Sequence, residues 1–460
     1  MSEKTDTIVA RSTPPGEGPV AIIRISGPDS HSLVGKCFVS KQSENEDKYN
    51  YLTLGELRNP QNGKLIDRVM CVRFREPHSY TGEDAAEIQC HGSPAIVRMI
   101  LETLCGCGAR MAEPGEFSRR AFLNGKMDLT RAEAVCDLIR SRTDKAARLA
   151  LRQVQGGLYK KTNEIRSGIV SVCAEIEARL DFPEDDLEQE NMQHILSTLE
   201  STVKQIRKLI KQGSGARIFR QGARVVFLGR PNTGKSSLFN ALLKMDRAIV
   251  TPHPGTTRDT IESTVDLNGC PVTYVDTAGV RSEVSEVEML GIERSKQEAS
   301  RADLNIFLID ASECLTEEDK ALFNLVRNTP FILALNKIDL PRVFAGEEIA
   351  AIKENAKNTV KTSIITESGL EDLENIISEA LLSDVSRSED LLIVNERHAE
   401  LLRNAADSIE EAFTGLKNGS YHDLVMVDLR HGLHLLSRIT GEEVSEDILD
   451  QIFSKFCIGK

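Results

Sequence analysis

The chain has 460 residues, a formal net charge of −13 and 40% apolar residues. A chain of this length is expected to form about three domains. It contains no apolar run near the roughly 20 residues that a membrane-spanning helix needs and no visible secretory signal, so we expect a cytoplasmic protein that does not enter the membrane. The negative charge argues against a non-specific nucleic-acid coat protein, because phosphate binding rests on cationic surface. The ten cysteines show no metal-binding spacing and are interpreted as reduced, mostly buried thiols.

The first part of the chain alternates short apolar runs with turn residues. The pattern predicts strands at 20–26, 66–74 and 85–92 and a helix at 94–108. We therefore expect an α+β domain at 1–121.

After this domain, the sequence pattern becomes typical of helices. Thr130 and Glu133 have the spacing of a capping box, and the stretch 122–216 predicts long helices broken near 181–186. The sequence QGSGARIFRQG at 212–222 is interpreted as a linker. Helical texture returns at 396–413 and 424–441, so 384–460 is predicted to be the second part of the same helical domain.

Between the helical parts, strands and helices alternate. The segments RVVFLG, VTYVDTAG, LNIFLID and FILALNKID contain the near-continuous apolar runs typical of a buried parallel sheet. An α/β domain at 217–383 is therefore predicted to be inserted into the helical domain. The expected fold class is multidomain, with α/β and α parts.

The segment GRPNTGKS at 229–236 fits the phosphate-loop pattern directly after a predicted strand. Glycines allow backbone N–H groups to surround phosphate oxygens, and the following helix adds its positive end. Lys235 is expected to reach the β- and γ-phosphates, and Ser236 to bind Mg²⁺.

Two later segments indicate guanine nucleotides. DTAG at 276–279 offers Asp276 to the water shell of Mg²⁺ and Gly279 to the γ-phosphate. In NKID, Asp339 can accept two hydrogen bonds from the guanine edge, a pair that adenine lacks. TPHPGTTRD resembles a first switch, with Thr257 as a second Mg²⁺ ligand. The predicted GTP-binding residues are Asn232, Thr233, Gly234, Lys235, Ser236, Ser237, Thr251, Thr256, Thr257, Asp276, Thr277, Ala278, Gly279, Asn336, Lys337, Asp339, Ser363 and Ile364.

The residue after DTAG departs from Ras-like proteins, where a glutamine orients the attacking water. Val280 cannot do this. Glu288 is a candidate for the task, and the other interpretation of its acidic stretch is a solvated switch helix.

Several segments together resemble one family. TPPGEGPVAIIRISG, YTGED, HGSP, PGEFSRRAFLNGKMDL, GRPNTGKSSLFNAL, GTTRD and the terminal FCIGK are similar, in this order, to the tRNA-modification GTPases called MnmE or TrmE. The resemblance implies an N-terminal folate-binding, dimerising domain, a helical domain and an inserted G domain. It implies a homodimer that works with an FAD-dependent partner, MnmG (GidA), in a hetero-oligomer that modifies the wobble uridine of tRNA at C5, adding an aminomethyl or carboxymethylaminomethyl group.

The resemblance also implies cofactors and sites. A tetrahydrofolate derivative, in the 5-formyl or 5,10-methylene form, would bind Arg24, Glu87, Lys126 and Lys460 and supply the one-carbon unit. K⁺ would stimulate the GTPase from a site formed by Asn232 and by Thr251, His253 and Thr256. Glu288 falls on the family's water-positioning glutamate, and Lys235 serves in catalysis. In FCIGK, Cys457 is either a nucleophile or a small packing residue, and Lys460 brings a charge to the folate site.

Basic residues near the junction of the first two domains could contact tRNA, or could be solvated charges on helix surfaces. They are Arg119, Arg120, Arg131, Arg140, Arg142, Lys145, Arg148 and the stretch 207–224. Two rival functions remain: a regulatory GTPase of the ribosome-assembly type, and a folate-dependent transferase whose G domain is only structural. The N-terminal domain with FCIGK argues against the first, and the intact phosphate-loop and switch residues argue against the second.

Overall fold

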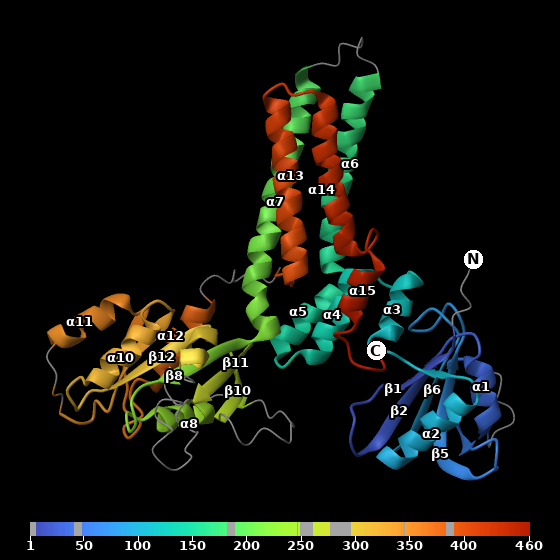
Figure 1. The fold of residues 1–460 in the computed structure, drawn as a ribbon, viewed down its shortest axis with the longest axis horizontal. Coiled ribbons are helices and arrows are strands. Elements are labelled where there is room, and N and C mark those ends of the chain that lie inside the picture. The colour runs from blue at the N-terminus through green and yellow to red at the C-terminus, as the bar shows by residue number, and fades with distance from the viewer. Residues whose placement is uncertain are drawn as a thin grey trace. The chain divides into compact units, whose positions relative to one another are not determined.

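The computed structural model describes residues 6–40, 48–181, 189–245, 247–248, 261–276, 296–341, 343, 346–382 and 391–460. They form two compact units that each combine distant parts of the chain (Figure 1). The first unit is drawn from Met1–Cys136, Val154–Leu196 and Glu411–Lys460, and the second from Asp137–Gln153 and Ser197–Glu410. Within the described ranges, none of the helices combines the length and the apolar character that crossing a membrane requires.

The first unit contains a seven-stranded sheet in the order β3-β4-β5-β6-β2-β1-β7. Only the β1–β7 pair is parallel. Helices α1 (Ser30–Cys37) and α2 (Pro94–Gly106) supply buried residues to the core of this sheet. The strands are β1 (Ile8–Arg11), β2 (Gly18–Ser26), β3 (Phe38–Ser40), β4 (Thr53–Arg58), β5 (Leu65–Phe74), β6 (Ala85–Gly92) and β7 (Arg110–Met111). The predicted strands at 20–26, 66–74 and 85–92 and the predicted helix at 94–108 are confirmed.

The helices of the first unit join segments that are far apart in sequence. Helices α6 (Gly157–Asp181) and α14 (His422–Thr440) run side by side (Figure 1). A small apolar cluster joins α4 (Leu129–Arg140) to α15 (Glu446–Phe453) and Phe456, while α3 (Glu116–Leu123) lies against α15. The last helix of the chain is therefore tied to residues that lie more than 300 positions earlier.

The predicted capping box at Thr130 is wrong. Helix α4 already begins at Leu129, so Thr130 lies inside its first turn. Asp128 accepts hydrogen bonds from the Thr130 hydroxyl, 2.5 Å, and from the Arg131 backbone N–H, 3.2 Å. The Asp128 carboxylate therefore accepts from a backbone N–H group in the first turn of the helix. The Thr130 hydroxyl was expected to perform this capping role.

The second unit contains a sheet in the order β14-β13-β12-β8-β11-β10-β9. The four runs predicted to be parallel form β8 (Ala223–Leu228), β11 (Cys270–Asp276), β12 (Leu304–Asp310) and β13 (Phe331–Asn336), and they are parallel to one another. β14 (Asn358–Lys361) extends the parallel part, whereas β9 (Arg247–Ala248) and β10 (Ile261–Leu267) pair antiparallel. The helices are α8 (Lys235–Met245), α10 (Glu317–Val326), α11 (Gly346–Asn355) and α12 (Leu370–Leu382). The predicted class of α/β and α parts is confirmed.

The linker predicted at 212–222 is wrong, because the stretch is the end of the long helix α7 (Gln189–Gln221). Ala216 and Phe219 are buried in the core of the second unit, and a side chain on Gly213 would collide with Val394. The glycines that suggested a linker therefore permit close packing. Helices α5 (Asp144–Val154) and α13 (Glu396–Lys417) complete the described helices of this region.

Candidate functional site

The phosphate loop connects the end of β8 to the start of α8. Gly234 has a φ of 98°, and a Cβ there would lie 2.3 Å from Nδ2 of Asn336. Glycine is therefore required both by the backbone conformation and by the close approach. The hydroxyl of Thr233 donates to the carbonyl oxygen of Arg230 over 2.9 Å, which closes the loop on itself.

Lys235 begins α8, and its side chain turns back over the loop. Its Nζ donates to the carbonyl oxygens of Gly229, at 2.6 Å, and Arg230, at 2.8 Å. Ser236 and Ser237 follow in the first turn and are exposed. The ammonium group and the N–H groups of the helix start together provide positive charge for a polyphosphate.

The NKID segment, predicted to bind the base, is tied directly to this loop. Asn336 ends β13, and its Nδ2 donates to the carbonyl oxygen of Thr233 over 2.8 Å. The hydroxyl of Thr362 donates to Oδ1 of Asn336 over 3.1 Å. Asn336 is fully buried. The predicted base-binding segment and the phosphate loop are therefore held in one hydrogen-bonded arrangement.

A carboxylate and a hydroxyl hold the rest of NKID. Lys337 has a φ of 62° and its Nζ lies 2.6 Å from Oδ2 of Asp310. Burial alone would raise the pKa of Asp310, but hydrogen bonds from Lys337 and Ser312 outweigh this effect and the pKa lies below its usual value. The hydroxyl of Ser363 donates to Oδ1 of Asp339 over 2.6 Å. Asp339 is exposed, so its carboxylate, held by Ser363, is accessible to a ligand.

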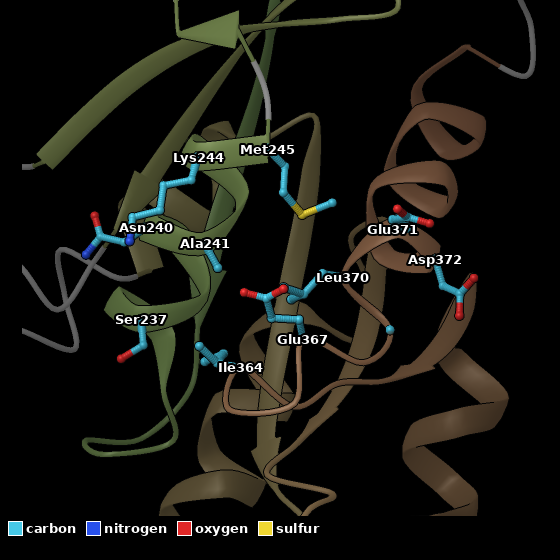
Figure 2. A pocket seen from close by; sticks show the side chains of 11 residues that line it. Ser237, Asn240, Ala241, Lys244, Met245, Ile364, Glu367, Leu370, Glu371 and Asp372 are labelled. Carbon is cyan, nitrogen blue, oxygen red and sulfur yellow. The ribbon is translucent and has the colours of Figure 1, made fainter.

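Ser237 and Ile364 line one pocket of about 720 Å³ (Figure 2). One wall comes from α8, including Asn240 and Lys244, and the other from the segment that leads into α12. Ser237 from the predicted phosphate side and Ile364 from the predicted base side therefore lie around one cavity.

Asp276 is the last residue of β11 and is buried beside β8, where it pairs in register with Phe227. It thus lies on the strand next to the one that carries the phosphate loop. The remaining predicted residues of this site lie outside the described residues: Thr251, His253, Thr256, Thr257, Thr277, Ala278, Gly279, Glu288 and also Val280.

Sequence reasoning missed Thr362 and Asp310, which hold Asn336 and Lys337. A signal was present, because Asp310 ends strand β12 and Thr362 follows strand β14. Polar residues at the carboxyl ends of parallel strands meet at the ligand-binding edge of the sheet.

A second constellation lies in the first unit, around Arg24. Arg24 on β2 faces Glu87 on β6 in register, and its Nη2 lies 2.8 Å from the Glu87 carboxylate. The guanidinium also lies over the rings of Tyr80 and Phe117, at 5.0 and 5.8 Å from their centroids. The tyrosine hydroxyl is within 2.8 Å of the Ser118 hydroxyl. The ring contacts fix the guanidinium plane, which sequence reasoning did not foresee.

The C-terminal tail reaches this constellation. Ile458 forms an isolated β-bridge with Pro114, and the Gly459 carbonyl accepts hydrogen bonds from Ser12, at 3.2 Å, and Arg24, at 3.5 Å. Gly459 has a φ of 90°, and a Cβ there would lie 2.2 Å from the carbonyl oxygen of Arg11. Only glycine permits this approach.

Lys460 shares an electrostatic environment with Arg24 and Glu87. Burial is the largest cause that lowers the pKa of Lys460, the positive charge of Arg24 lowers it further, and Glu87 opposes both. The Cys457 side chain is exposed beside them. Lys126 makes other contacts, because its Nζ donates to the Pro77 carbonyl over 2.8 Å and its chain lies along Gly82.

Several of the basic residues considered for tRNA are engaged in ion pairs, and Arg119 and Arg120 use theirs to hold the fold. Arg120 is buried and bonds Asp6, Glu83 and Glu116, so its role is structural. Arg119 pairs with Asp450 over 3.0 Å, which ties α3 to α15. For this pair of arginines, the structure favours the interpretation that does not involve RNA.

A phosphate loop after a central parallel strand, hydrogen-bonded to an NKID segment at the end of a neighbouring strand, is the arrangement of a GTP-binding protein of the phosphate-loop class. Two family models match the chain: the GTP-binding protein TrmE N-terminus over residues 7–126 and the MnmE helical domain over residues 129–457. The chain belongs to the MnmE family of tRNA modification GTPases.

Curated relatives span the whole chain. The tRNA modification GTPase MnmE of Carboxydothermus hydrogenoformans is 42% identical over 99% of both chains. The protein of the same name from Thermotoga maritima is 42% identical over 99% of this chain and all of its own. A solved structure, a single-residue variant of Era from Aquifex aeolicus bound to GDP and AlF4⁻, is 25% identical, covers 40% of this chain and 66% of its own, and has a TM-score of 0.28. The family assignment does not depend on it.

Proposed function

We propose that this protein is the GTP-hydrolysing component of a system that modifies the wobble uridine of tRNA at C5. Family membership supports the GTPase activity and its link to tRNA modification. The observation that carries the proposal is that one chain has both a phosphate loop tied to the NKID segment and a second polar constellation around Arg24 that its own C-terminal tail contacts. The proposed domains are 1–121, 122–216, 217–383 and 384–460, and the predicted cytoplasmic location stays a prediction.

In the nucleotide site, Lys235 and the start of α8 bind the phosphates and Asp339 reads the guanine edge. The Ser236 hydroxyl and the buried Asp276 carboxylate fit Mg²⁺, because this ion prefers oxygen donors. When bound, Mg²⁺ would neutralise developing charge on the phosphates. Thr257 is proposed as the second protein ligand and Glu288 as the residue that positions water.

K⁺ is proposed to bind beside the phosphates through Asn232 and the backbone near Thr251, His253 and Thr256. Asn232 is exposed in the loop with a φ of 64°, so its amide oxygen is available to a cation. A monovalent cation there would stabilise transition-state charge as an arginine does in other GTPases.

GTP turnover is therefore expected to be about tenfold or more faster in KCl than in NaCl at equal ionic strength. Steady-state phosphate release measures this, and Asn232→Ala should reduce the difference between the two salts. Equal rates for the unchanged protein in K⁺ and Na⁺ would remove the proposed cation site.

A tetrahydrofolate derivative, 5-formyl or 5,10-methylene, is proposed to bind at Arg24 and Glu87, with Lys126 and Lys460 as further contacts. A pterin presents an N–H and an amino group side by side, and the Glu87 carboxylate can accept both. Arg24 already holds one oxygen of Glu87 and is itself held by Tyr80 and Phe117. The carboxylate is thus oriented before any ligand arrives.

The protein is proposed to act as a homodimer with an FAD-dependent partner, MnmG, in a hetero-oligomer that binds tRNA. The N-terminal sheet supports the homodimer, because Leu54 and Met70 are exposed cross-strand neighbours and Val39 is also exposed. Apolar side chains gathered on one sheet face are typical of an interface.

Mass spectrometry of tRNA nucleosides from cells that lack this protein tests the proposal. We expect the C5-modified wobble uridine to disappear and to return when the gene is restored. Unchanged nucleosides would favour a regulatory GTPase of the ribosome-assembly type.

A further inference from the structure

Two cysteines meet beneath the N-terminal sheet of the first unit. Cys37 is the last residue of α1, and Cys107 directly follows α2. Their Sγ atoms lie 3.6 Å apart, although the residues are 70 positions apart in the chain. The expectation of reduced, mostly buried thiols does not account for two thiols in contact.

The two thiols differ in access. Cys37 is 1% exposed, whereas Cys107 is partly exposed and lines a surface pocket of about 410 Å³. The opposite wall of that pocket comes from the turn between β4 and β5, including Asn59 and Lys64. A small polar oxidant can therefore reach the sulfur of Cys107 before that of Cys37.

We propose that Cys37 and Cys107 are a redox-modified pair that forms an intramolecular disulfide when a small hydroperoxide enters this pocket. In the first step, the Cys107 sulfur attacks the terminal oxygen of the hydroperoxide, an S–O bond forms and the O–O bond breaks. The leaving alkoxide, or hydroxide when the oxidant is hydrogen peroxide, takes the Cys107 thiol proton and departs as an alcohol or water. In the second step, the Cys37 sulfur attacks the resulting sulfenic acid. The S–S bond forms, the S–O bond breaks, and the hydroxide takes the Cys37 proton. Two thiols are oxidised and one hydroperoxide is reduced.

The order of the steps agrees with the electrostatics. Burial, and then the hydrogen bond with Cys107, raise the pKa of Cys37 to about 12. Cys37 therefore stays a thiol at neutral pH and is a poor first nucleophile. It is better suited to resolve a sulfenic acid that is already in contact with it.

The disulfide would join the carboxyl ends of α1 and α2. Cys107 also begins the segment that leads through β7 to Pro114, which bridges Ile458 of the tail. Because the two cysteines are 70 positions apart, the disulfide would restrict the unfolded chain and thereby stabilise the fold. The melting temperature of the full-length protein should rise by several degrees on oxidation and fall back on reduction.

The test uses the full-length protein treated with hydrogen peroxide, alkylated without reduction and digested for mass spectrometry. We expect a Cys37–Cys107 cross-linked peptide that disappears after reduction. Cys105→Ser is the matched control, because it lies two residues from Cys107 and should leave the cross-link intact. Cys37→Ser and Cys107→Ser should each abolish it.

Exposed Cys314 and Cys457 report whether the oxidant has acted on the protein. If both are oxidised while Cys37 and Cys107 are still recovered as alkylated thiols after denaturation, the proposal is overturned. A Cys105–Cys107 link in place of the expected one would overturn it as well. The wild-type measurement needs no variant, so it stays decisive even if a serine substitution impairs folding.

Discussion

The Asp339→Asn variant is expected to bind GTP at least about 100-fold more weakly, since two hydrogen bonds to a charged acceptor contribute about 1.5–3 kcal/mol each. The same variant should bind xanthosine triphosphate better than the unchanged protein does. Xanthine carries a carbonyl where guanine has its 2-amino group, and an asparagine amide can donate to that oxygen. The Ser363 hydroxyl, 2.6 Å from Oδ1 of Asp339, should keep the side chain oriented. Titration calorimetry with both nucleotides measures the switch.

A suitable control is Glu317→Gln, which removes a carboxylate from the exposed start of α10 in the same unit. It carries the same change in net charge and should leave the affinities for both nucleotides unchanged. If Asp339→Asn kept its full affinity for GTP, the guanine edge would be read by another group.

Deletion of Ile458 to Lys460 is expected to abolish tRNA modification while GTP hydrolysis stays within about twofold of the unchanged protein. The deletion removes the carbonyl that Ser12 and Arg24 bind, and the charge that Arg24 and Glu87 surround. The nucleotide loop and its contacts belong to the second unit and are untouched. The readouts are the modified nucleoside in tRNA and phosphate release.

Single substitutions refine this result. Gly459→Val should reproduce the loss of modification, because its side chain would collide with the Arg11 carbonyl. Gly168→Ala is the control, since its added Cβ has no other atom within 4 Å. Cys457→Ser removes the thiol of the tail but keeps a side chain of similar size. Loss of tRNA modification would assign the thiol a chemical role, and retained modification would make Cys457 a packing residue. A fully modified wobble uridine in the truncated protein would show that the tail is dispensable.

The sequence by itself predicted the elements whose physics is local. Buried strands are visible in the sequence as apolar runs, and the phosphate loop is visible as glycines followed by Lys235 and Ser236. The position of Asp339 was also predictable, because it follows a strand by three residues, and its role in reading the base stays a prediction. The composition of 212–222 led to a wrong prediction, because glycine and serine are typical of linkers. Only the structure shows that Gly213 packs closely against Val394.

Tertiary structure alone decided the contacts between distant parts of the chain. The Gly459 carbonyl meets Ser12, which lies 447 positions earlier, and Cys37 meets Cys107 across 70. Arg24 faces Glu87 only because β2 and β6 pair in one register, and a slip of one residue would turn the two side chains to opposite faces. Local patterns record what a segment prefers, whereas partners of this kind depend on strand register and helix packing over the whole unit, which no short stretch of sequence contains.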